Sequence, residues 1–321
     1  MTATLRQSGT LLGFAAIFVF FAVQLPDTFL TARNLINITQ QLSMLAVVAA
    51  TMTIVMVMND FDLSVGSMAS LAGVVAAVLF AAGFPVWVGL LAALFVGLAG
   101  GLVNGFLVSI VGILPFVATL GTLTVFSGMA FLISGGKTIF GRDIPAGFSG
   151  FARGGIPLES VGAGNVKLPF LTITAAIVAG VCWFVLEHTV FGRKLYAIGG
   201  NREAAHLAGI RHRRLRLIAF GLTGLGAATA GLMYAARVAS ANPTQGSGLM
   251  LDAIAAVFLG MTMTRQGEPR VVYTLMGVLM LGILDNGLTQ MQVDSYVREI
   301  LVGVIVIAAV AIAAISKGAH R

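Results

Sequence analysis

Residues 63–136 read LSVGSMASLAGVVAAVLFAAGFPVWVGLLAALFVGLAGGLVNGFLVSIVGILPFVATLGTLTVFSGMAFLISGG and contain no Asp, Glu, Lys or Arg. A helix that crosses a membrane needs about 20 apolar residues, at about 1.5 Å of rise for each. Three such helices fit within these 74 residues. A soluble domain has no core large enough to bury this stretch, so it indicates membrane-spanning helices.

The composition of the whole chain agrees with this interpretation. Apolar residues make up 58% of the 321 residues and charged residues only 10%, whereas ordinary soluble domains have about a quarter charged residues. These values predict an all-α, polytopic integral membrane protein with a single transmembrane domain over residues 1–321. The net charge of +7 does not indicate nucleic-acid binding, because the positive residues fall in loops between the apolar stretches.

The apolar stretches predict about ten membrane-spanning helices. We expect them at residues 10–25, 35–58, 64–83, 86–108, 115–134, 168–186, 215–237, 252–264, 271–285 and 297–315. The eighth and ninth are short, which predicts broken, tilted or re-entrant helices that other parts of the protein shield from lipid.

The positions of Lys and Arg predict the orientation. Seven of the 19 lie in the loop 187–216, namely Arg193, Lys194, Arg202, Arg211, Arg213, Arg214 and Arg216. Cytoplasmic loops carry an excess of Lys and Arg, so we expect this loop in the cytoplasm. Six predicted spans precede it and four follow, which puts both termini in the cytoplasm as well. The loop 135–168 is then on the outer side, and its Gly and Pro content predicts a structured lid or docking segment.

A weak internal similarity links two spans. Asn104 closes the fourth span within GLVNG, and Asn286 closes the ninth within GILDNG. These two ends face opposite sides of the membrane in the predicted topology, as an inverted repeat requires. Two short matches also arise by chance, so both interpretations stand.

The segment Asn59-Asp60-Phe61-Asp62-Leu63-Ser64 places two carboxylates between long apolar helices. An ionisable residue embedded in a membrane is a functional candidate, so Asp62 and Ser64 are candidates for a solute pathway or gate. Either side chain could instead cap the third span by accepting from its free amides. A proton-coupled transporter would need a carboxylate deeper within a span.

The segment that begins at Pro115 carries Phe116, Thr119 and Thr122 at three-residue spacing. This spacing puts the three side chains on roughly one helix face. One aromatic ring and two hydroxyl groups could line a pathway for a polar, uncharged solute. The threonines could equally bond to their own backbone or to a neighbouring helix.

The segment 191–210 predicts a short helix in the cytoplasmic loop. Asn201 is a good helix cap with Glu203 in the first turn, and Gly209 would end the helix. Ala204, Ala205 and Ala208 would give it a smooth face that fits a groove on another protein. The alternative is a solvated loop with no partner.

The sequence gives no indication of catalysis. It contains no GxxxxGK[ST] phosphate-binding motif, and its four histidines show no metal-ligand spacing. We therefore expect a protein that is not an enzyme, with no cofactor and no metal.

Taken together, these segments resemble the permease subunits of bacterial ATP-binding-cassette sugar importers of the ribose, xylose and galactose type. The resemblance rests on residues 62–66, 115–121, 192–205, 248–256 and 286–288 in this order, and it covers nearly the whole chain. Two segments depart from the family pattern. Residues 59–61 replace a pair of glycines, and residues 259–270 replace a glycine-rich loop.

The resemblance implies an importer in the bacterial cytoplasmic (inner) membrane, surrounded by lipid. It would contain a second permease copy, identical or paralogous, a cytoplasmic ATPase with two nucleotide sites, and a periplasmic sugar-binding protein. This chain would supply the pathway, with Asp62, Ser64, Asn104, Phe116, Thr119, Thr122 and Asn286 as its candidate residues. It would also supply the contact to the ATPase, with Arg193, Asn201, Glu203, Ala204, Ala205, Ala208 and Gly209.

A secondary active transporter of a small polar solute is the alternative. The possible inverted repeat and the two carboxylates near Asp62 favour it, but the sequence offers no clear cation site. The sequence does not identify the sugar.

Overall fold

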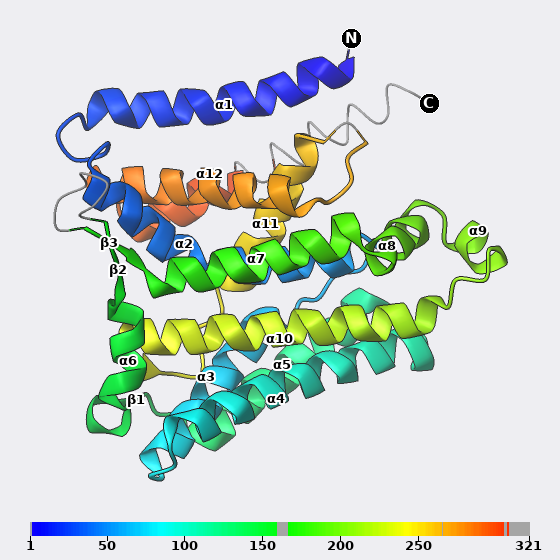
Figure 1. Cartoon of the computed structure of the whole chain (residues 1–321), viewed down its shortest axis with the longest axis horizontal. Coiled ribbons are helices and arrows are strands. Elements are labelled where there is room, and N and C mark those ends of the chain that lie inside the picture. Colours follow the sequence, from blue (N-terminus) through cyan, green and yellow to red (C-terminus); the bar gives the residue numbers. More distant parts are fainter. Residues whose placement is uncertain (1, 159–165, 265, 305–306, 308–321) are drawn as a thin grey trace.

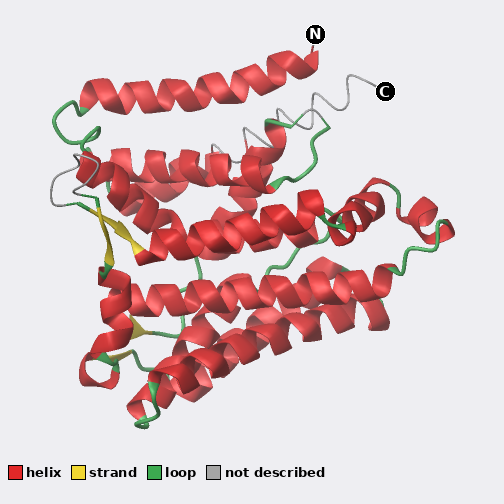
Figure 2. Ribbon diagram, in the orientation of Figure 1, coloured by secondary structure: helices red, strands yellow, loops and turns green. Residues whose placement is uncertain are grey.

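The computed structural model describes residues 2–158, 166–264, 266–304 and 307, with side chains from residue 10 onwards. Helices make up most of it, and four very short strands lie at one end (Figures 1 and 2). The long helices are α1 Thr2–Gln24, α2 Ala32–Met56, α3 Val65–Ala81, α4 Val86–Phe106, α5 Pro115–Ser134, α7 Phe170–His188, α10 His212–Val238, α11 Leu249–Thr262 and α12 Val271–Gln290. The shorter elements are η1 Leu107–Val111, β1 Ile139–Phe140, η2 Gly141–Asp143, α6 Ala146–Arg153, β2 Gly155–Pro157, β3 Lys167–Pro169, α8 Val190–Gly200, α9 Arg202–Leu207 and β4 Ser240–Ala241.

The predicted spans agree with the observed helices. Six helices are long and apolar enough to cross a membrane, and three shorter apolar helices cover Thr10–Gln24, Val65–Ala81 and Leu249–Thr262. These nine coincide with the first nine predicted spans. The ninth is not short, however, because α12 has 20 residues and continues helical past the charged Asp285. The tenth predicted span, 297–315, lies largely outside the described residues.

The helices are arranged so that the molecule has two distinct ends (Figure 1). One end carries α8, α9, the end of α2 and the start of α10, and we call it the coupling end after the ATPase contact that the sequence predicts. The opposite end carries α6 and the four strands, and we call it the outer end after the orientation that the sequence predicts. The N-terminal part of α1 lies toward the coupling end, where Thr10 Oγ1 is 3.0 Å from Thr262 Oγ1 at the end of α11.

Two of the helices start inside the bundle after a non-helical segment. Residues 57–64 separate α2 from α3, and residues 239–248 separate α10 from α11. Each break contains a residue other than glycine in the left-handed region, Asn59 at φ +60° and Ala239 at φ +53°. Non-helical backbone within a membrane protein needs internal hydrogen-bond partners. This requirement explains why both segments are surrounded by helices.

The two broken units have opposite directions, as an inverted repeat requires. The end of α2 and the start of α10 meet at the coupling end, and α4 and α12 also run in opposite directions (Figure 1). Gly66 and Gly246 touch each other where the units cross, since a Cβ at either position would collide with the carbonyl oxygen of the other. The close contact between the two units therefore requires glycine on both sides.

The loop 135–168 is structured where it is described. Strand β1 pairs with β4, and β2 pairs with β3, both antiparallel. The buried Phe148 of α6 packs against Phe80 of α3, with 5.0 Å between ring centroids. These contacts attach the outer end to the ends of the long helices.

Candidate functional site

A buried polar cluster joins α3, α4 and α5 near the break after α2. Asp62 Oδ1 accepts from the Ser64 hydroxyl at 2.6 Å and from the Ser64 backbone N–H at 2.9 Å. Asn104 Nδ2 of α4 donates to Ser64 Oγ at 2.8 Å and to Asp62 Oδ1 at 3.3 Å. Thr122 of α5 donates to Asn104 Oδ1 at 2.6 Å. Four residues that the sequence analysis selected from three separate segments therefore form one connected network.

The hydrogen bonds show how Asp62 is attached to the start of α3 and to α4. Ser64 is the N-cap of α3, but its side chain makes no capping hydrogen bond to the helix. Asp62 accepts the Ser64 N–H and therefore fixes the turn that leads into the helix. Its carboxylate also reaches α4 through Asn104, which a simple cap does not do.

The predicted face on α5 is only partly correct. Thr119 and Thr122 are buried, and Thr119 Oγ1 donates to Pro115 O at 2.8 Å and lies 3.4 Å from Phe61 O. Phe116 is 56% exposed. A three-residue step turns through 300° on an α-helix, so Phe116 and Thr122, two steps apart, point in directions about 120° apart. The expectation that Phe116 shares the face of the two threonines is wrong.

Asn286 lies in a different cluster. It is buried on α12 at the outer end, where its Oδ1 accepts from Asn34 Nδ2 at 3.1 Å and from Gln290 Nε2 at 2.8 Å. Asn104 and Asn286 thus occupy opposite ends of the bundle, as expected for repeat-related positions. The structure does not bring Asn286 to the Asp62 cluster.

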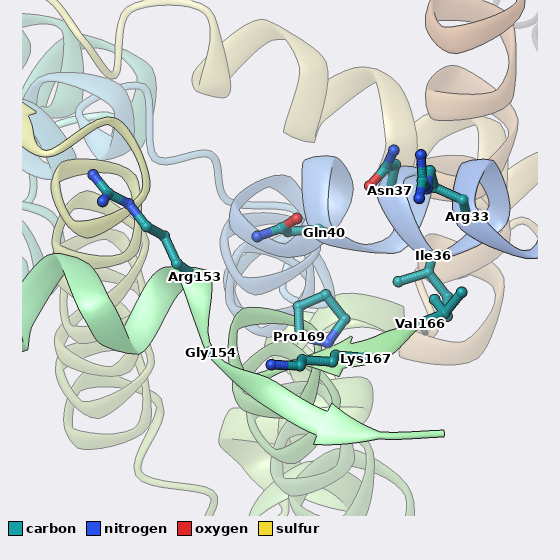
Figure 3. A pocket seen from close by; sticks show the side chains of 9 residues that line it. All are labelled: Arg33, Ile36, Asn37, Gln40, Arg153, Gly154, Val166, Lys167 and Pro169. Carbon is teal, nitrogen blue, oxygen red and sulfur yellow. The ribbon is translucent and has the colours of Figure 1, made fainter. Parts of the chain in front are cut away.

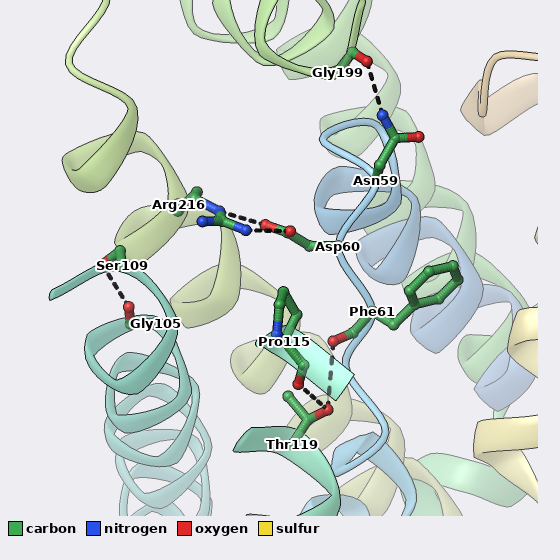
Figure 4. A network of polar contacts seen from close by, with 9 residues as sticks. All are labelled: Asn59, Asp60, Phe61, Gly105, Ser109, Pro115, Thr119, Gly199 and Arg216. Carbon is green, nitrogen blue, oxygen red and sulfur yellow. Dashed lines mark hydrogen bonds and ion pairs between the residues drawn. The ribbon is translucent and has the colours of Figure 1, made fainter. Parts of the chain in front are cut away.

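A buried ion pair links the break after α2 to the start of α10 (Figure 4). The Arg216 guanidinium donates to both carboxylate oxygens of Asp60, with Nε to Oδ2 at 2.6 Å. Arg216 is 5% exposed and Asp60 3% exposed. The sequence analysis counted Arg216 among the basic residues of the cytoplasmic loop 187–216 and missed this pair. Its position at the start of the predicted span 215–237 was the available signal, because a charge there needs a partner.

Helix α8 also contacts segment 57–64 at the coupling end. Asn59 Nδ2 donates to the Gly199 carbonyl oxygen at 2.7 Å (Figure 4). Gly199 itself lies against the Val57 carbonyl, and a Cβ at this position would collide with it. The last turn of α8 therefore packs directly on the backbone of segment 57–64.

The short helix α9 forms as the sequence predicted. Asn201 Oδ1 accepts from the Ala204 N–H at 3.0 Å, and Gly209 ends the helix with φ +77°. The Ile210 N–H bonds to Ala205 O at 3.0 Å and the Gly209 N–H bonds to His206 O at 2.9 Å. This pair of bonds is a Schellman motif, in which the side chain after the glycine packs on the last turn.

The Schellman motif corrects the predicted docking face. Ala205 is 5% exposed, because it occupies the position that faces Ile210 inside the motif. Ala204 and Ala208 are exposed. The residue that the sequence analysis overlooked is Leu207, which is 84% exposed. A large apolar side chain beside two alanines could have been recognised from the sequence as an anchor.

A group of polar residues also fixes the end of α7 and the middle of α8 to the start of α12. Tyr196 Oη donates to Pro269 O at 3.0 Å, and Arg270 pairs with Glu187 at 3.0 Å. Burial, reinforced by the Glu187 carboxylate, raises the pKa of Tyr196. The phenol therefore stays protonated as a hydrogen-bond donor. Arg193 and Glu203 are exposed and take no part in these contacts.

Comparisons with known proteins agree with this architecture. Residues 34–310 match a family model described as branched-chain amino acid transport system / permease component. The chain is 38% identical to the ribose import permease protein of Escherichia coli over 298 residues, which are 92% of this chain and 90% of that protein. It is 35% identical to the ribose import permease protein of Bacillus subtilis over 309 residues, 95% of this chain and 92% of that protein. It is 34% identical to the L-arabinose transport system permease protein of Escherichia coli over 305 residues, 95% and 89% of the two chains. No solved structure gives a significant match.

Proposed function

The chain belongs to the permease components of ATP-binding-cassette importers, and we propose that it forms part of the membrane pathway for ribose or a related monosaccharide. It is a transport subunit and not an enzyme. Relatives named for ribose and L-arabinose import match it over nearly their whole length. The family model is named for branched-chain amino acids, but the names of these relatives support a monosaccharide as the transported solute.

Importers of this class work with an ATPase and a substrate-binding protein. We propose that the coupling end faces the cytoplasm and contacts an ATPase with two nucleotide sites. The outer end then faces the periplasm and its binding protein, and a second permease copy completes the pathway. The basic residues of the loop 187–216 support this orientation.

The observation that carries the functional proposal is the position of segment 57–64. One end of this segment holds Val57, Asn59 and Asp60, which contact α8 and α10 on either side of α9. Its other end holds Asp62 and Ser64 in the polar cluster. A displacement of α9 by the ATPase would therefore move both attachments and, through them, the cluster.

The polar cluster is suited to act as a gate for an uncharged solute. Its hydroxyl, amide and carboxylate groups bond to one another, and the four residues are at most 7% exposed. Sugar hydroxyl groups can replace such bonds one for one, which keeps the cost of opening small. We assign Asp62, Ser64, Asn104 and Thr122 to this gate, with Thr119 fixing segment 57–64 from α5.

At the coupling end, we propose that Ala204, Leu207 and Ala208 enter a groove on the ATPase. The capping residues Asn201 and Gly209 hold the helix, and Ala205 packs inside the motif. Arg193 and Glu203 lie at the rim of this surface. A helix of this length is not stable alone in water, so its caps and its partner must hold it.

Transport by the reconstituted importer tests the proposal. The chain is combined in proteoliposomes with the ATPase and binding protein encoded beside it, and uptake of labelled ribose and of labelled leucine is measured with and without ATP. We expect saturable ribose uptake that requires ATP and no leucine uptake. Ribose uptake without ATP would favour a secondary transporter, and leucine uptake would favour the solute in the name of the family model.

A further inference from the structure

The outer end contains a cavity of about 220 Å³ that the proposed pathway does not use (Figure 3). It lies between the first turns of α2, the end of α6 and the paired strands β2 and β3. Its lining residues are Arg33, Ile36, Asn37, Gln40, Arg153, Gly154, Val166, Lys167 and Pro169.

Three cationic residues, Arg33, Arg153 and Lys167, line the cavity, and no carboxylate is among the described residues that line it. Within the described residues, none of these three cations takes part in an ion pair. The three residues are exposed, so solvent screens their mutual repulsion. Together they give the cavity a net positive charge, which favours an anion.

Most of the residues that carry these groups lie on helices or paired strands. Arg33, Asn37 and Gln40 follow one another on one face of α2 at helical spacing, and Figure 3 shows Arg33 and Asn37 side by side. Gln40 Nε2 donates to Ala152 O of α6 at 3.0 Å, which joins the two helices. Lys167 is paired with Pro157 in the β2–β3 ladder. Cations and amide donors on such supports suit the oxygen atoms of a phosphate group.

Apolar residues also belong to this region. Ile36 and Val166 line the cavity, and Leu35, Phe151 and Ile156, which are close in sequence to lining residues, are 39%, 46% and 52% exposed. A free inorganic anion gains nothing from such a rim, whereas acyl chains or glycerol carbons do. The combination of a cationic cavity and an apolar rim matches an anionic amphiphile at the membrane surface.

We propose that this cavity binds a phosphate group, supplied by the headgroup of an anionic phospholipid or by free phosphate. The rim favours the phospholipid. The proposal does not depend on which solute the chain conducts, and the site would attach α2, α6 and β3 to the outer leaflet.

Lipid binding to the purified full-length chain tests this site. Native mass spectrometry counts phosphatidylglycerol molecules retained by the wild type and by the Arg33→Gln/Lys167→Gln variant, with phosphatidylcholine as the neutral lipid. We expect the variant to retain phosphatidylglycerol about 30-fold less, because each cation near an anionic surface contributes about 1 kcal/mol, or about fivefold. The matched control is Lys137→Gln/Arg142→Gln, which removes two exposed cations of the same loop that do not line the cavity.

Thermal unfolding distinguishes the two sources of phosphate. Stabilisation of the wild type by inorganic phosphate beyond that by sodium chloride of equal ionic strength, and its loss in the variant, identifies free phosphate as a ligand. Stabilisation by phosphatidylglycerol alone identifies the lipid. Equal loss of lipid in the cavity variant and the control would overturn the proposal, because binding would then be a property of the general surface charge. Absence of binding by both probes, with weaker association of the binding protein in the variant, would overturn it in favour of a protein contact.

Discussion

The two non-helical segments, 57–64 and 239–248, occupy related places in the broken units and are held in different ways. In segment 57–64, Asn59, Asp60, Asp62 and Ser64 each bond to another part of the chain or to one another, and the bonds reach α4, α8 and α10. In segment 239–248, the polar side chains bond mainly to each other.

The details of the second segment show how local its contacts are. Asn242 Oδ1 accepts from the Thr244 N–H and hydroxyl at 3.0 Å each, and the Asn242 N–H donates to Gln245 Oε1 at 3.2 Å. Its bonds to other elements are the short β4–β1 pairing and the Gly246 N–H to Ser70 Oγ at 2.8 Å.

This difference leads us to expect separate tasks for the two units. Segment 57–64 connects the α8–α9 region to the polar cluster and is suited to transmit movement. Segment 239–248 forms the break in the other unit, and no hydrogen bond among the described residues joins it to the coupling end. We therefore expect substitutions in the first segment to change transport more than comparable substitutions in the second.

The largest effect is expected from the buried ion pair. Asp60→Ala leaves the Arg216 guanidinium buried without its partner, and removing one member of a buried pair costs about 3–5 kcal/mol. We expect a strong loss of thermal stability and at least about 100-fold slower uptake in proteoliposomes.

A second variant separates stability from coupling. Asp60→Leu/Arg216→Met replaces the pair by apolar side chains, which is often neutral for stability. We expect this variant to fold and to bind the ATPase, but to hydrolyse ATP with little uptake. Normal uptake by the double variant would contradict the transmission role of segment 57–64. Asn242→Ala, in the other segment, is the comparison and should change uptake less than about threefold.

A smaller effect is expected at α9. Leu207→Glu places a charge where an exposed leucine would enter the ATPase groove, and burying a leucine contributes about 1.5–3 kcal/mol. We expect the ATPase to bind about 30-fold more weakly, with unchanged thermal stability of the isolated chain, because Leu207 is exposed there. The measurement is co-purification and stimulated ATP hydrolysis.

The control for Leu207→Glu is Phe140→Glu, which alters an exposed apolar residue of the outer end and should leave ATPase binding unchanged.

Ala205→Glu tests the stability of α9 and not its docking surface. It places a charge inside the Schellman motif, and we expect it to destabilise the α8–α9 hairpin. Normal ATPase binding by Leu207→Glu would move the docking surface elsewhere, most directly to the loop 263–270.

The next prediction compares uptake after removal of one hydrogen-bond partner of segment 57–64 with uptake after removal of one partner of segment 239–248. Asn104→Ala removes the amide that joins Asp62, Ser64 and Thr122, and leaves buried groups unpaired at a cost of about 1–3 kcal/mol. Ser70→Ala removes only the bond to the Gly246 N–H. We expect about tenfold slower uptake with Asn104→Ala and about twofold slower uptake with Ser70→Ala, at unchanged basal hydrolysis. Equal slowing of uptake by the two variants would contradict a larger role in transport for segment 57–64 than for segment 239–248.

The sequence predicted those features that depend on neighbouring residues. Apolar length located nine helices, and the cap Asn201 and the stop Gly209 located α9, because helix boundaries follow from local hydrogen bonding. Asp62 was recognisable as a candidate because burying a carboxylate between two apolar helices costs free energy, and such residues are usually functional.

The features that the sequence did not predict depend on contacts between distant segments. The Asp60–Arg216 pair joins residues 156 positions apart, and no local pattern specifies that pairing. Phe116 was misplaced because three-residue spacing is only approximately one face. Ala205 was misplaced because its burial is due to Ile210, on the far side of the glycine that ends the helix.

The smallest expected effect concerns Gln245 in segment 239–248. Within the described residues, its Nε2 is buried without a hydrogen-bond partner, close to where a Cβ on Gly73 would lie. Gln245→Met keeps a similar shape and removes this unpaired donor, whose burial costs about 1–3 kcal/mol. The change also removes Oε1 as the acceptor for the Asn242 N–H, so the two effects partly offset each other. We expect a net stabilisation below about 1 kcal/mol, seen as a rise of about 1–2 °C in the unfolding temperature, with uptake unchanged within about twofold. Gln245→Glu is the paired variant, because it retains the acceptor and adds a buried charge, and it should be clearly destabilising. If Gln245→Met instead slows uptake about tenfold while the chain becomes more stable, the unpaired amide serves the solute. Segment 239–248 would then carry a function as demanding as that of segment 57–64.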